Sequence, residues 1–301
     1  MLSFFTDRNR VDVITNKKTM ILYQLPDSDI ERFIEEDVPY GDLTTSLLGI
    51  GEQQGTITFT SRHHTVLSCT EEAGRVLEKC GATVISRLPS GTEVEAGTAF
   101  LAASGSAMSL HAGWKVAMNI LEYASGIATR TAKVVRAARS ANPGISIVTT
   151  RKSFPGTKKV AIKSIMAGGA LPHRLGISET ILVFRQHTAF LGGLEQFLDQ
   201  LVQLKARAPE NKVIVEADTT EEAMIIASAG ADVVQVDKMP PDQLTVLASE
   251  IHRKFPGVRV SAAGGINADN AALYAGTGVD ILVLSSVYFG KPADIGVVIQ
   301  P

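Results

Sequence analysis

Cysteine is scarce in this sequence: Cys69 and Cys80 are the only two, and their spacing matches neither a Cys-x-x-Cys motif nor a pair of metal ligands. We therefore expect reduced structural thiols in a cytoplasmic protein, because disulfides are rare in reducing compartments. No apolar run approaches the roughly 20 residues of a membrane-spanning helix, which predicts no membrane partner. Residues 1–19 also lack the apolar stretch of a signal peptide, and we expect them to be an unstructured extension.

Neither charge nor aromatic content is high. The chain has 29 basic and 31 acidic residues, so no domain-wide basic field is present to bind nucleic acid. Aromatic residues make up 6% of the chain and glycines number 26, which favours an α/β enzyme over a β-sandwich or a disordered chain. The length of 301 residues accommodates one βα barrel of about 250 residues, or two domains.

The two halves of the chain have different patterns. Residues 22–127 resemble a mixed α/β domain that ends in a long helix over 109–126. From Thr131 onward, strand, loop and helix repeat, and the strands are short apolar runs without alternation, which predicts a parallel sheet or barrel covered on both faces. The expected strands are 145–149, 181–184, 213–215, 233–236, 258–262 and 281–284, and the expected helices are 194–208, 220–229, 241–255 and 268–275.

Polar or glycine-rich residues follow every one of these strands. Because βα barrels build their active sites at the carboxyl-terminal ends of the strands, we expect these residues to surround a site. They are, in chain order, Arg151 and Lys152, Arg185 and His187, Glu216 and Asp218, Asp237 and Lys238, Gly264 and Gly265, and Ser285 and Ser286.

The segment from Thr149 to Arg174 concentrates positive charge in a chain whose net charge is −2. It begins at a strand end and is broken by Phe154-Pro155-Gly156, so it predicts a loop site for a small polyanion. A solvated helix face beside a basic loop is the alternative, with His173 buried and Arg174 on the surface. The cations are Arg151, Lys152, Lys158, Lys159, Lys163, His173 and Arg174.

Two further groups suggest phosphate and metal binding. Gly264-Gly265-Ile266-Asn267 and Leu284-Ser285-Ser286 follow the last two strands, where barrels often bind phosphate through backbone N–H groups, although a tight turn would also explain the glycines. Glu216 and Asp237 could hold Mg²⁺ against a diphosphate, or pair with the nearby cations instead.

Together these groups predict transfer of a sugar phosphate from a diphosphate donor to an anionic acceptor. The alternative is a non-catalytic small-anion-binding protein. The pair Glu216 and Asp237 weighs against it, since carboxylates repel a bare oxyanion.

Eight segments resemble the quinolinate phosphoribosyltransferase (carboxylating nicotinate-nucleotide pyrophosphorylase) family, and within it the ModD branch, named for molybdenum transport operons. The likeness covers nearly everything from Met20 to the C-terminus. The segments are EEDVPYGDLTT (35–45), NILEYASGIAT (119–129), TTRKSFPGTKK (149–159), GGALPHR (168–174), VIVEAD (213–218), ADVVQVDKM (231–239), AAGGI (262–266) and TGVDILVLSS (277–286).

The resemblance implies an amino-terminal α/β sandwich domain over residues 20–128, a seven-stranded βα barrel over 129–289, and a tail over 290–301 that returns to the first domain. It also implies a head-to-tail homodimer with the active site shared at the interface, where Lys115 reaches into the neighbouring barrel. Larger assemblies of dimers are left open.

The resemblance also implies the reaction and the residue roles. A pyridine carboxylate such as quinolinate attacks phosphoribosyl pyrophosphate with bound Mg²⁺, as in NAD biosynthesis. Lys152 contacts both substrates, and Glu216 and Asp237 face the ribose hydroxyls and Mg²⁺. The acceptor's carboxylates would bind Arg151, His173 and Arg174, and the 5-phosphate would bind at Gly264, Gly265, Ser285 and Ser286.

Three positions depart from the family pattern. Phe184 stands where a lysine is usual, Lys115 replaces an interface arginine, and Ala263 replaces the serine of the phosphate turn. Arg185 could partly compensate for the missing lysine, although on a strand it would point to the opposite face from Phe184. These changes leave phosphoribosyl transfer in place and put the identity of the acceptor in question. For the alternative, the resemblance implies a non-catalytic small-anion-binding accessory protein linked to molybdate uptake.

Overall fold

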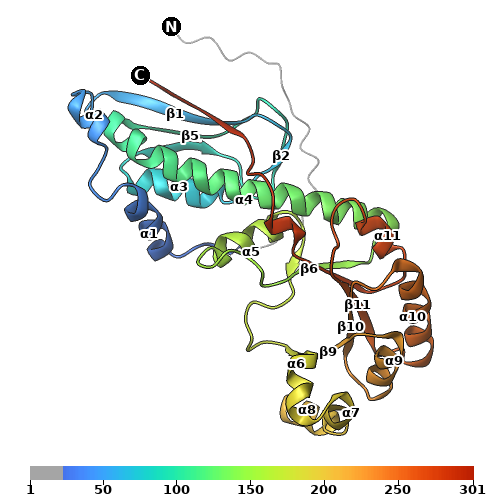
Figure 1. Ribbon diagram of the computed structural model, residues 1–301. Helices are drawn as coiled ribbons and strands as arrows, with labels where there is room; N and C mark the ends of the chain where they lie inside the picture. The colour runs from blue at the N-terminus through green and yellow to red at the C-terminus, as the bar shows by residue number, and fades with distance from the viewer. Residues whose placement is uncertain (1–22) are drawn as a thin grey trace.

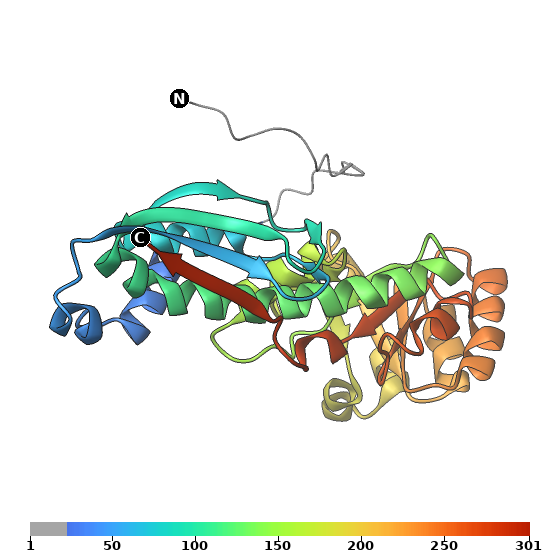
Figure 2. The same ribbon diagram turned by 90° about the horizontal axis from the view of Figure 1, so that it is seen from above.

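The computed structural model describes residues 23–301, so the extension predicted over residues 1–19 lies outside the described residues. The described chain belongs to the α/β class, as predicted. It contains a four-stranded antiparallel sheet and a seven-stranded parallel sheet, which lie side by side along one long helix (Figures 1 and 2). Within residues 23–301, no helix combines the length and the apolar character needed to cross a membrane.

The antiparallel sheet has the strand order β13-β1-β5-β3. Its central strand β1 (Gln54–Ser61) pairs on one side with β5 (Ala99–Ser106), and β5 pairs with the edge strand β3 (Thr83–Arg87). On its other side β1 pairs with the last strand of the chain, β13 (Ile295–Gln300), so the C-terminus completes the sheet that the N-terminal half begins.

Helices cover one face of this sheet (Figure 2). α3 (Thr70–Lys79) packs against α4 (Ala107–Ala141), and both contribute apolar side chains to a core that includes Ile57 and Phe59 of β1. This half also contains the helices α1 (Asp27–Asp37) and α2 (Leu43–Leu47), and a ladder of β2 (Thr65–Val66) with β4 (Glu93–Val94).

The helix α4 is longer than the sequence predicts: it has 35 residues and continues through Gly126, where the expected helix ends. A Cβ atom at Gly126 would lie 3.0–3.1 Å from backbone atoms of residues 291–293. Glycine is therefore needed here because another segment crosses the helix closely, and it does not mark a helix end. The first turns of α4 pack in the core of the antiparallel sheet through Leu110, and the last turns pack against the parallel sheet through Val134 and Ala138.

The parallel sheet has the strand order β7-β6-β12-β11-β10-β9-β8. Its edge strands β7 and β8 do not pair with each other among the described residues, so the predicted seven-stranded barrel is an open half-barrel. The short edge strand β7 is not predicted by the sequence pattern. The strands are β6 (Ser146–Thr149), β7 (Leu171–Pro172), β8 (Ile181–Val183), β9 (Val213–Ala217), β10 (Val233–Asp237), β11 (Arg259–Ala263) and β12 (Ile281–Leu284).

Alternate residues of these strands face the helices and the interior. In β9, Val213 and Val215 belong to the core under the helices, whereas Ile214 clusters with Leu182 and Val233 on the concave side. Both faces are covered, which explains the continuous apolar runs. The same alternation turns Glu216 toward the interior.

Helices α9 (Thr220–Ser228), α10 (Pro241–Lys254) and α11 (Ala271–Ala275) fall within three predicted helices, and the fourth is divided into α7 (Leu194–Leu198) and α8 (Leu201–Arg207). The short helix α6 (Arg185–Thr188) and the 3₁₀ turns Ala189–Leu191 and Ser286–Tyr288 are not predicted by the sequence pattern, nor is α5 (Lys158–Ala167).

Helix α5 carries three of the cations that the sequence pattern assigns to one polyanion site. Lys158 is exposed, and Lys159 lies 2.6 Å from Asp29 of α1. Lys163 is 1% exposed, and its Nζ lies 2.6 Å from Glu72 and 3.0 Å from Glu71 of α3. Lys159 and Lys163 therefore attach α5 to the antiparallel half. None of the three lysines lines the cavity at the strand ends, so the interpretation of the whole basic run as one site is wrong for them.

Replacing Lys163 by methionine is expected to lower the free energy of unfolding by about 3–5 kcal/mol, because Glu72 would stay buried without its counter-charge. Urea unfolding followed by circular dichroism measures this change. Lys159→Met is the matched control, since it breaks a half-exposed pair on the same helix and should change stability little. Equal effects of the two substitutions would contradict the assignment.

Candidate active site

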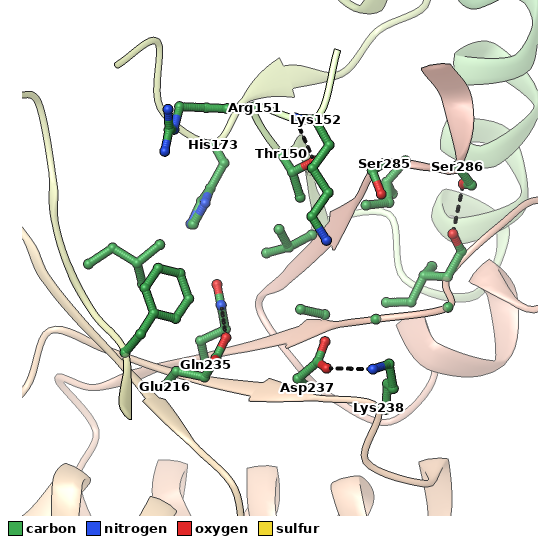
Figure 3. A pocket seen from close by; sticks show the side chains of 18 of the residues that line it. Thr150, Arg151, Lys152, His173, Glu216, Gln235, Asp237, Lys238, Ser285 and Ser286 are labelled. Atoms are coloured by element: carbon green, nitrogen blue, oxygen red, sulfur yellow. Dashed lines mark hydrogen bonds and ion pairs between the residues drawn. The ribbon is translucent and has the colours of Figure 1, made fainter. Parts of the chain in front are cut away.

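A cavity of about 640 Å³ opens at the carboxyl-terminal ends of the parallel strands (Figure 3). All of the predicted site residues except Lys115 and Arg185 line it. Those brought together are Arg151, Lys152, His173, Arg174, Phe184, Glu216, Asp237, Ala263, Gly264, Gly265, Ser285 and Ser286.

The basic side of the cavity comes from two neighbouring strand ends. β6 pairs in parallel with β7, and the backbone N–H of His173 donates to the Thr149 carbonyl at 2.9 Å. This pairing places Arg151 and Lys152 beside His173 and Arg174, although the two pairs are about twenty residues apart in sequence. The two-residue strand β7 is thus the reason that the basic segment forms one side of the site.

The sequence pattern counts His173 among the cations, but its surroundings in the fold disfavour the charged form. Burial lowers the pKa of His173, and the adjacent charge of Arg174 lowers it further. Burial and the nearby Arg151 also lower the pKa of Arg174, which leaves it charged because the ordinary pKa of arginine is so high. The positive charge of this side therefore comes from Arg151, Lys152 and Arg174.

The opposite side of the cavity is acidic. Glu216 of β9 is in register with Gln235 of β10, whose Nε2 donates to Glu216 Oε2 at 2.8 Å. Burial raises the pKa of Glu216; the Gln235 hydrogen bond and Lys152 oppose this shift, and Asp237 and Asp218 add to it. Asp237 ends β10, and its Oδ2 lies 3.3 Å from Lys238 Nζ (Figure 3).

Gly264 and Gly265 form the turn after β11, with φ of +87° and +72°. A Cβ atom at Gly264 would lie 2.9 Å from the backbone nitrogen of Lys238 and closer still to Asp237 Oδ1, so glycine is required where the turn meets the end of β10. Ser286 Oγ donates to the Ile266 carbonyl at 2.8 Å and ties this turn to the end of β12 (Figure 3). The turn is therefore fixed in a shape that exposes backbone to the cavity.

Phe184 and Leu182 form an apolar wall of the cavity. The Phe184 ring stacks on the His187 ring, with centroids 5.9 Å apart and planes 17° apart. The backbone N–H of Phe184 donates to His187 Nδ1 at 3.0 Å, which fixes the histidine in that position.

Two predicted site residues lie outside the cavity. The Arg185 side chain is 86% exposed, and one of its guanidinium nitrogens is 3.5 Å from Asp218 Oδ2. The residue begins α6 and does not compensate for the missing lysine within this chain's cavity. Lys115 lies on α4 in the antiparallel half, where its Nζ is 4.9 Å from the centroid of the Trp114 ring.

Several cavity residues are not predicted from the sequence. Gln235 is the most informative, because its signal is present: it is the one amide inside the apolar strand VVQVD, at a position that alternation turns inward. Thr150, Leu182 and Val283 are also not predicted, and the sequence pattern marks Lys238 only as a strand-end residue. Ile266, Asn267 and Leu284 belong to the segments predicted to bind phosphate, and they line the cavity.

A metal ion would find few ligands in this chain alone. Glu216 and Asp237 are the two acidic side chains that line the cavity. In the part of the chain that the structure describes, no group of three or more histidine, cysteine, aspartate or glutamate side chains could hold a metal ion. A cation bound here would need oxygen atoms from a ligand.

Comparison with known proteins gives consistent matches. The family model for the N-terminal domain of quinolinate phosphoribosyl transferase matches residues 42–125, and that for the C-terminal domain matches residues 127–297. "Putative pyrophosphorylase ModD" of Rhodobacter capsulatus is 41% identical over 251 residues, which are 83% of this chain and 96% of the relative. The nicotinate-nucleotide pyrophosphorylase (carboxylating) of Homo sapiens is 30% identical over 264 residues, 88% of each chain.

Solved structures have the same fold. NadC from Streptococcus pyogenes superposes with a TM-score of 0.84 at 24% sequence identity, covering 92% of this chain and 99% of that chain. The nicotinate-nucleotide pyrophosphorylase from Francisella tularensis has a TM-score of 0.83 at 22% identity.

Replacing Glu216 by glutamine is expected to raise the free energy of unfolding at pH 7. The pKa of Glu216 is raised in the folded protein, so its ionised form destabilises that state at neutral pH. The destabilisation shrinks as pH falls through the raised pKa and is absent below the ordinary value of 4.5. Glutamine removes the charge and can still accept the hydrogen bond from Gln235.

Urea unfolding of both proteins at pH 7 and near pH 4 tests this expectation. The stability gained at pH 7 should vanish at the lower pH. Glu210→Gln, at an exposed position, is the control. An equal gain at both pH values would show that burial of charge is not the cause.

Proposed function

The chain belongs to the quinolinate phosphoribosyl transferase family, and we propose that it transfers phosphoribose from phosphoribosyl pyrophosphate to the ring nitrogen of a pyridine carboxylate in a Mg²⁺-dependent reaction. The acceptor is quinolinate, which yields nicotinate mononucleotide, CO₂ and pyrophosphate, or a ring acid particular to the ModD branch.

The division of the cavity into a basic and an acidic side supports this proposal most strongly. A ring carboxylate fits Arg151 and Arg174, because guanidinium groups pair with carboxylates through two parallel hydrogen bonds. The ribose hydroxyls of the donor fit Glu216 and Asp237, which accept hydrogen bonds. A site for a bare anion would have no use for the acidic side.

The chemical step is a displacement at C1 of the ribose. The lone pair of the ring nitrogen forms the new C–N bond, the bond from C1 to the pyrophosphate oxygen breaks, and its electron pair leaves with pyrophosphate. Lys152 lines the cavity near both sides, and its mobile charge can follow the negative charge that develops on the leaving group. When quinolinate is the acceptor, the bond to its 2-carboxylate then breaks, CO₂ leaves and that carbon takes a proton.

The residues present fit a Mg²⁺ ion carried by the donor. Mg²⁺ prefers oxygen ligands and binds through one or two carboxylates plus substrate phosphates, so Glu216 and Asp237 would suffice. The Asp237–Lys238 pair does not compete strongly, because both side chains are substantially exposed. When bound, the ion would supply charge neutralisation of the leaving pyrophosphate.

We also propose that the protein is a homodimer. Tyr40, Leu43, Leu47 and Leu48 expose apolar side chains at the α2 end of the molecule, and Phe154 and Ile177 do so on the loops that carry the basic residues. Exposed apolar surface of this kind is typical of an interface. A symmetric pair would bring the α2 end of each protomer, and Lys115, toward the partner's cavity.

Pyrophosphate release tests the function. The protein is incubated with phosphoribosyl pyrophosphate and Mg²⁺, with quinolinate, nicotinate or related ring acids as the acceptor. Turnover with quinolinate would identify the carboxylating activity, and turnover with another ring acid alone would identify a transferase with a different acceptor. No release with any of them would overturn the proposal in favour of a non-catalytic anion-binding protein.

Asp237→Ala is expected to weaken Mg²⁺-dependent binding of phosphoribosyl pyrophosphate by about 100-fold, since a charged hydrogen-bonded group facing the donor is lost. Isothermal titration calorimetry measures the dissociation constant. Asp218→Ala is the matched control: Asp218 also follows an interior strand but does not line the cavity. Unchanged donor affinity in Asp237→Ala would rule out the metal assignment.

Phe184→Lys is expected to raise kcat/KM for quinolinate at least tenfold, because it adds a cation beside the second carboxylate of a dicarboxylate ring. Phe184→Leu removes the ring without adding charge and should not produce this gain. If the lysine variant uses quinolinate no better than the original protein, the acceptor is selected elsewhere.

A further inference from the structure

Gln235 is a polar side chain in the middle of an apolar strand, and it is 4% exposed. Its neighbours Val234 and Val236 pack in the core under the helices, so the amide faces the interior of the half-barrel. The hydrogen bond from Gln235 Nε2 to Glu216 Oε2 fixes the orientation of the amide, because an ionised carboxylate only accepts.

This orientation leaves Gln235 Oε1 without a hydrogen-bond partner. Gln235 lines the cavity, and Figure 3 shows the amide with its oxygen on the side away from Glu216. A buried acceptor without a partner lowers stability, and few native proteins leave one without a reason. A ligand that brings a donor to this atom would remove that cost.

The apolar wall of the cavity, formed by Phe184 and Leu182, lies on the same side of the sheet as Gln235, two strands away. Phe184 and Leu182 come from β8, Glu216 from β9 and Gln235 from β10, which are neighbours in the sheet. The Phe184 ring is held by its stack on His187, so it offers a fixed flat surface to an aromatic ligand. The cations Arg151 and Arg174 come from the opposite edge of the sheet.

We propose that the acceptor is an aromatic ring acid that also carries an N–H or O–H donor on the ring, and that Gln235 Oε1 and Phe184 select it. Its carboxylate would bind the arginines, its face would pack on Phe184 and its donor would bond to Gln235. This inference rests on the proposed function and specifies the class of acceptor for the same cavity.

The same arrangement disfavours a second carboxylate. A carboxylate oxygen next to Gln235 Oε1 would place two hydrogen-bond acceptors against each other. Next to Phe184, the carboxylate would lose its hydration without gaining a hydrogen-bond donor. An amino or hydroxyl group at that point would be satisfied. A site that hydrogen-bonds a polar group of its ligand discriminates strongly against analogues without that group. An apolar pocket discriminates much less against a ligand that carries an additional group.

Binding of matched ring acids tests the proposal. The probes are 2-aminonicotinate and 6-aminonicotinate, each paired with the methylnicotinate substituted at the same position, which has similar size and no donor. Calorimetry with the full chain gives the ratio of dissociation constants within each pair. We expect at least one amino compound to bind about tenfold or more tightly than its methyl partner.

The variant Gln235→Met should reduce that ratio to near one, because it keeps the length of the side chain and removes the acceptor. Since the ratio is taken within one variant, any change at Glu216 affects both probes alike. If the methionine variant does not fold, Gln235→Asn gives a second measurement. It withdraws the amide oxygen by one methylene and should also reduce the ratio of dissociation constants. Equal binding of the amino and methyl compounds to the unmodified protein, or no binding of either, would overturn the proposal.

Donor binding separates this inference from the proposed function. Phosphoribosyl pyrophosphate with Mg²⁺ is titrated into the same preparations. If the donor binds and the amino-to-methyl ratio of dissociation constants is near one, the proposed acceptor class is wrong, and the transferase function is not contradicted. The donor could instead fail to bind while the amino compound still binds much more tightly than its methyl partner, with Gln235→Met removing that difference. In that case the selection by Gln235 stands and the proposed transferase function does not.

Discussion

The buried contact of Lys163 with Glu72 and Glu71 joins the two halves of the protein at α5. Helix α5 lies between the loop that carries Arg151 and Lys152 and the strand that precedes His173 and Arg174. A lysine that is 1% exposed cannot move away from its carboxylates without leaving charges buried and unpaired. Because this contact holds α5 against α3, it also fixes the positions of the two ends of α5, from which the basic segments on either side extend.

The cavity itself is built at a cost to stability. Burial raises the pKa of Glu216, Gln235 Oε1 has no partner, and the backbone of Lys238 has a φ of +56°. Each of these features is unfavourable in isolation and all three lie around one cavity, which is where proteins tolerate strain and unpaired groups. The tightly packed helices on the outer face of the same strands carry the stability that makes this possible.

The sequence predicted the α/β class and most of the parallel strands, because apolar runs covered on both faces leave a clear pattern. It also predicted most of the residues that line the cavity, since strand ends in such a sheet converge at one edge. It failed where long-range packing decides the outcome. Gly126 resembles a helix end but permits a chain crossing, and β7 is too short to leave a pattern.

The role of each charged residue could not be predicted from the sequence for a similar reason. Lys163 and Arg151 both carry a positive charge and lie twelve residues apart. Only the fold shows that Lys163 faces buried carboxylates and that Arg151 faces a cavity. Arg185 follows a strand as the other site residues do, yet its side chain is directed toward Asp218 at the surface. Burial and direction of a side chain depend on partners that are distant in the chain.

The pairing of β13 with β1 has a consequence for how the protein is made. Residues 295–300 supply the strand that covers one side of β1, from Thr56 to Ser61, and they are synthesised long after β1. During synthesis β1 is therefore an open edge with free backbone N–H and C=O groups while more than two hundred residues are still being added. The parallel half can assemble as its βα units emerge, whereas the antiparallel sheet is complete only once β13 has been made, so we expect the sheet that begins first in the chain to close after the parallel sheet.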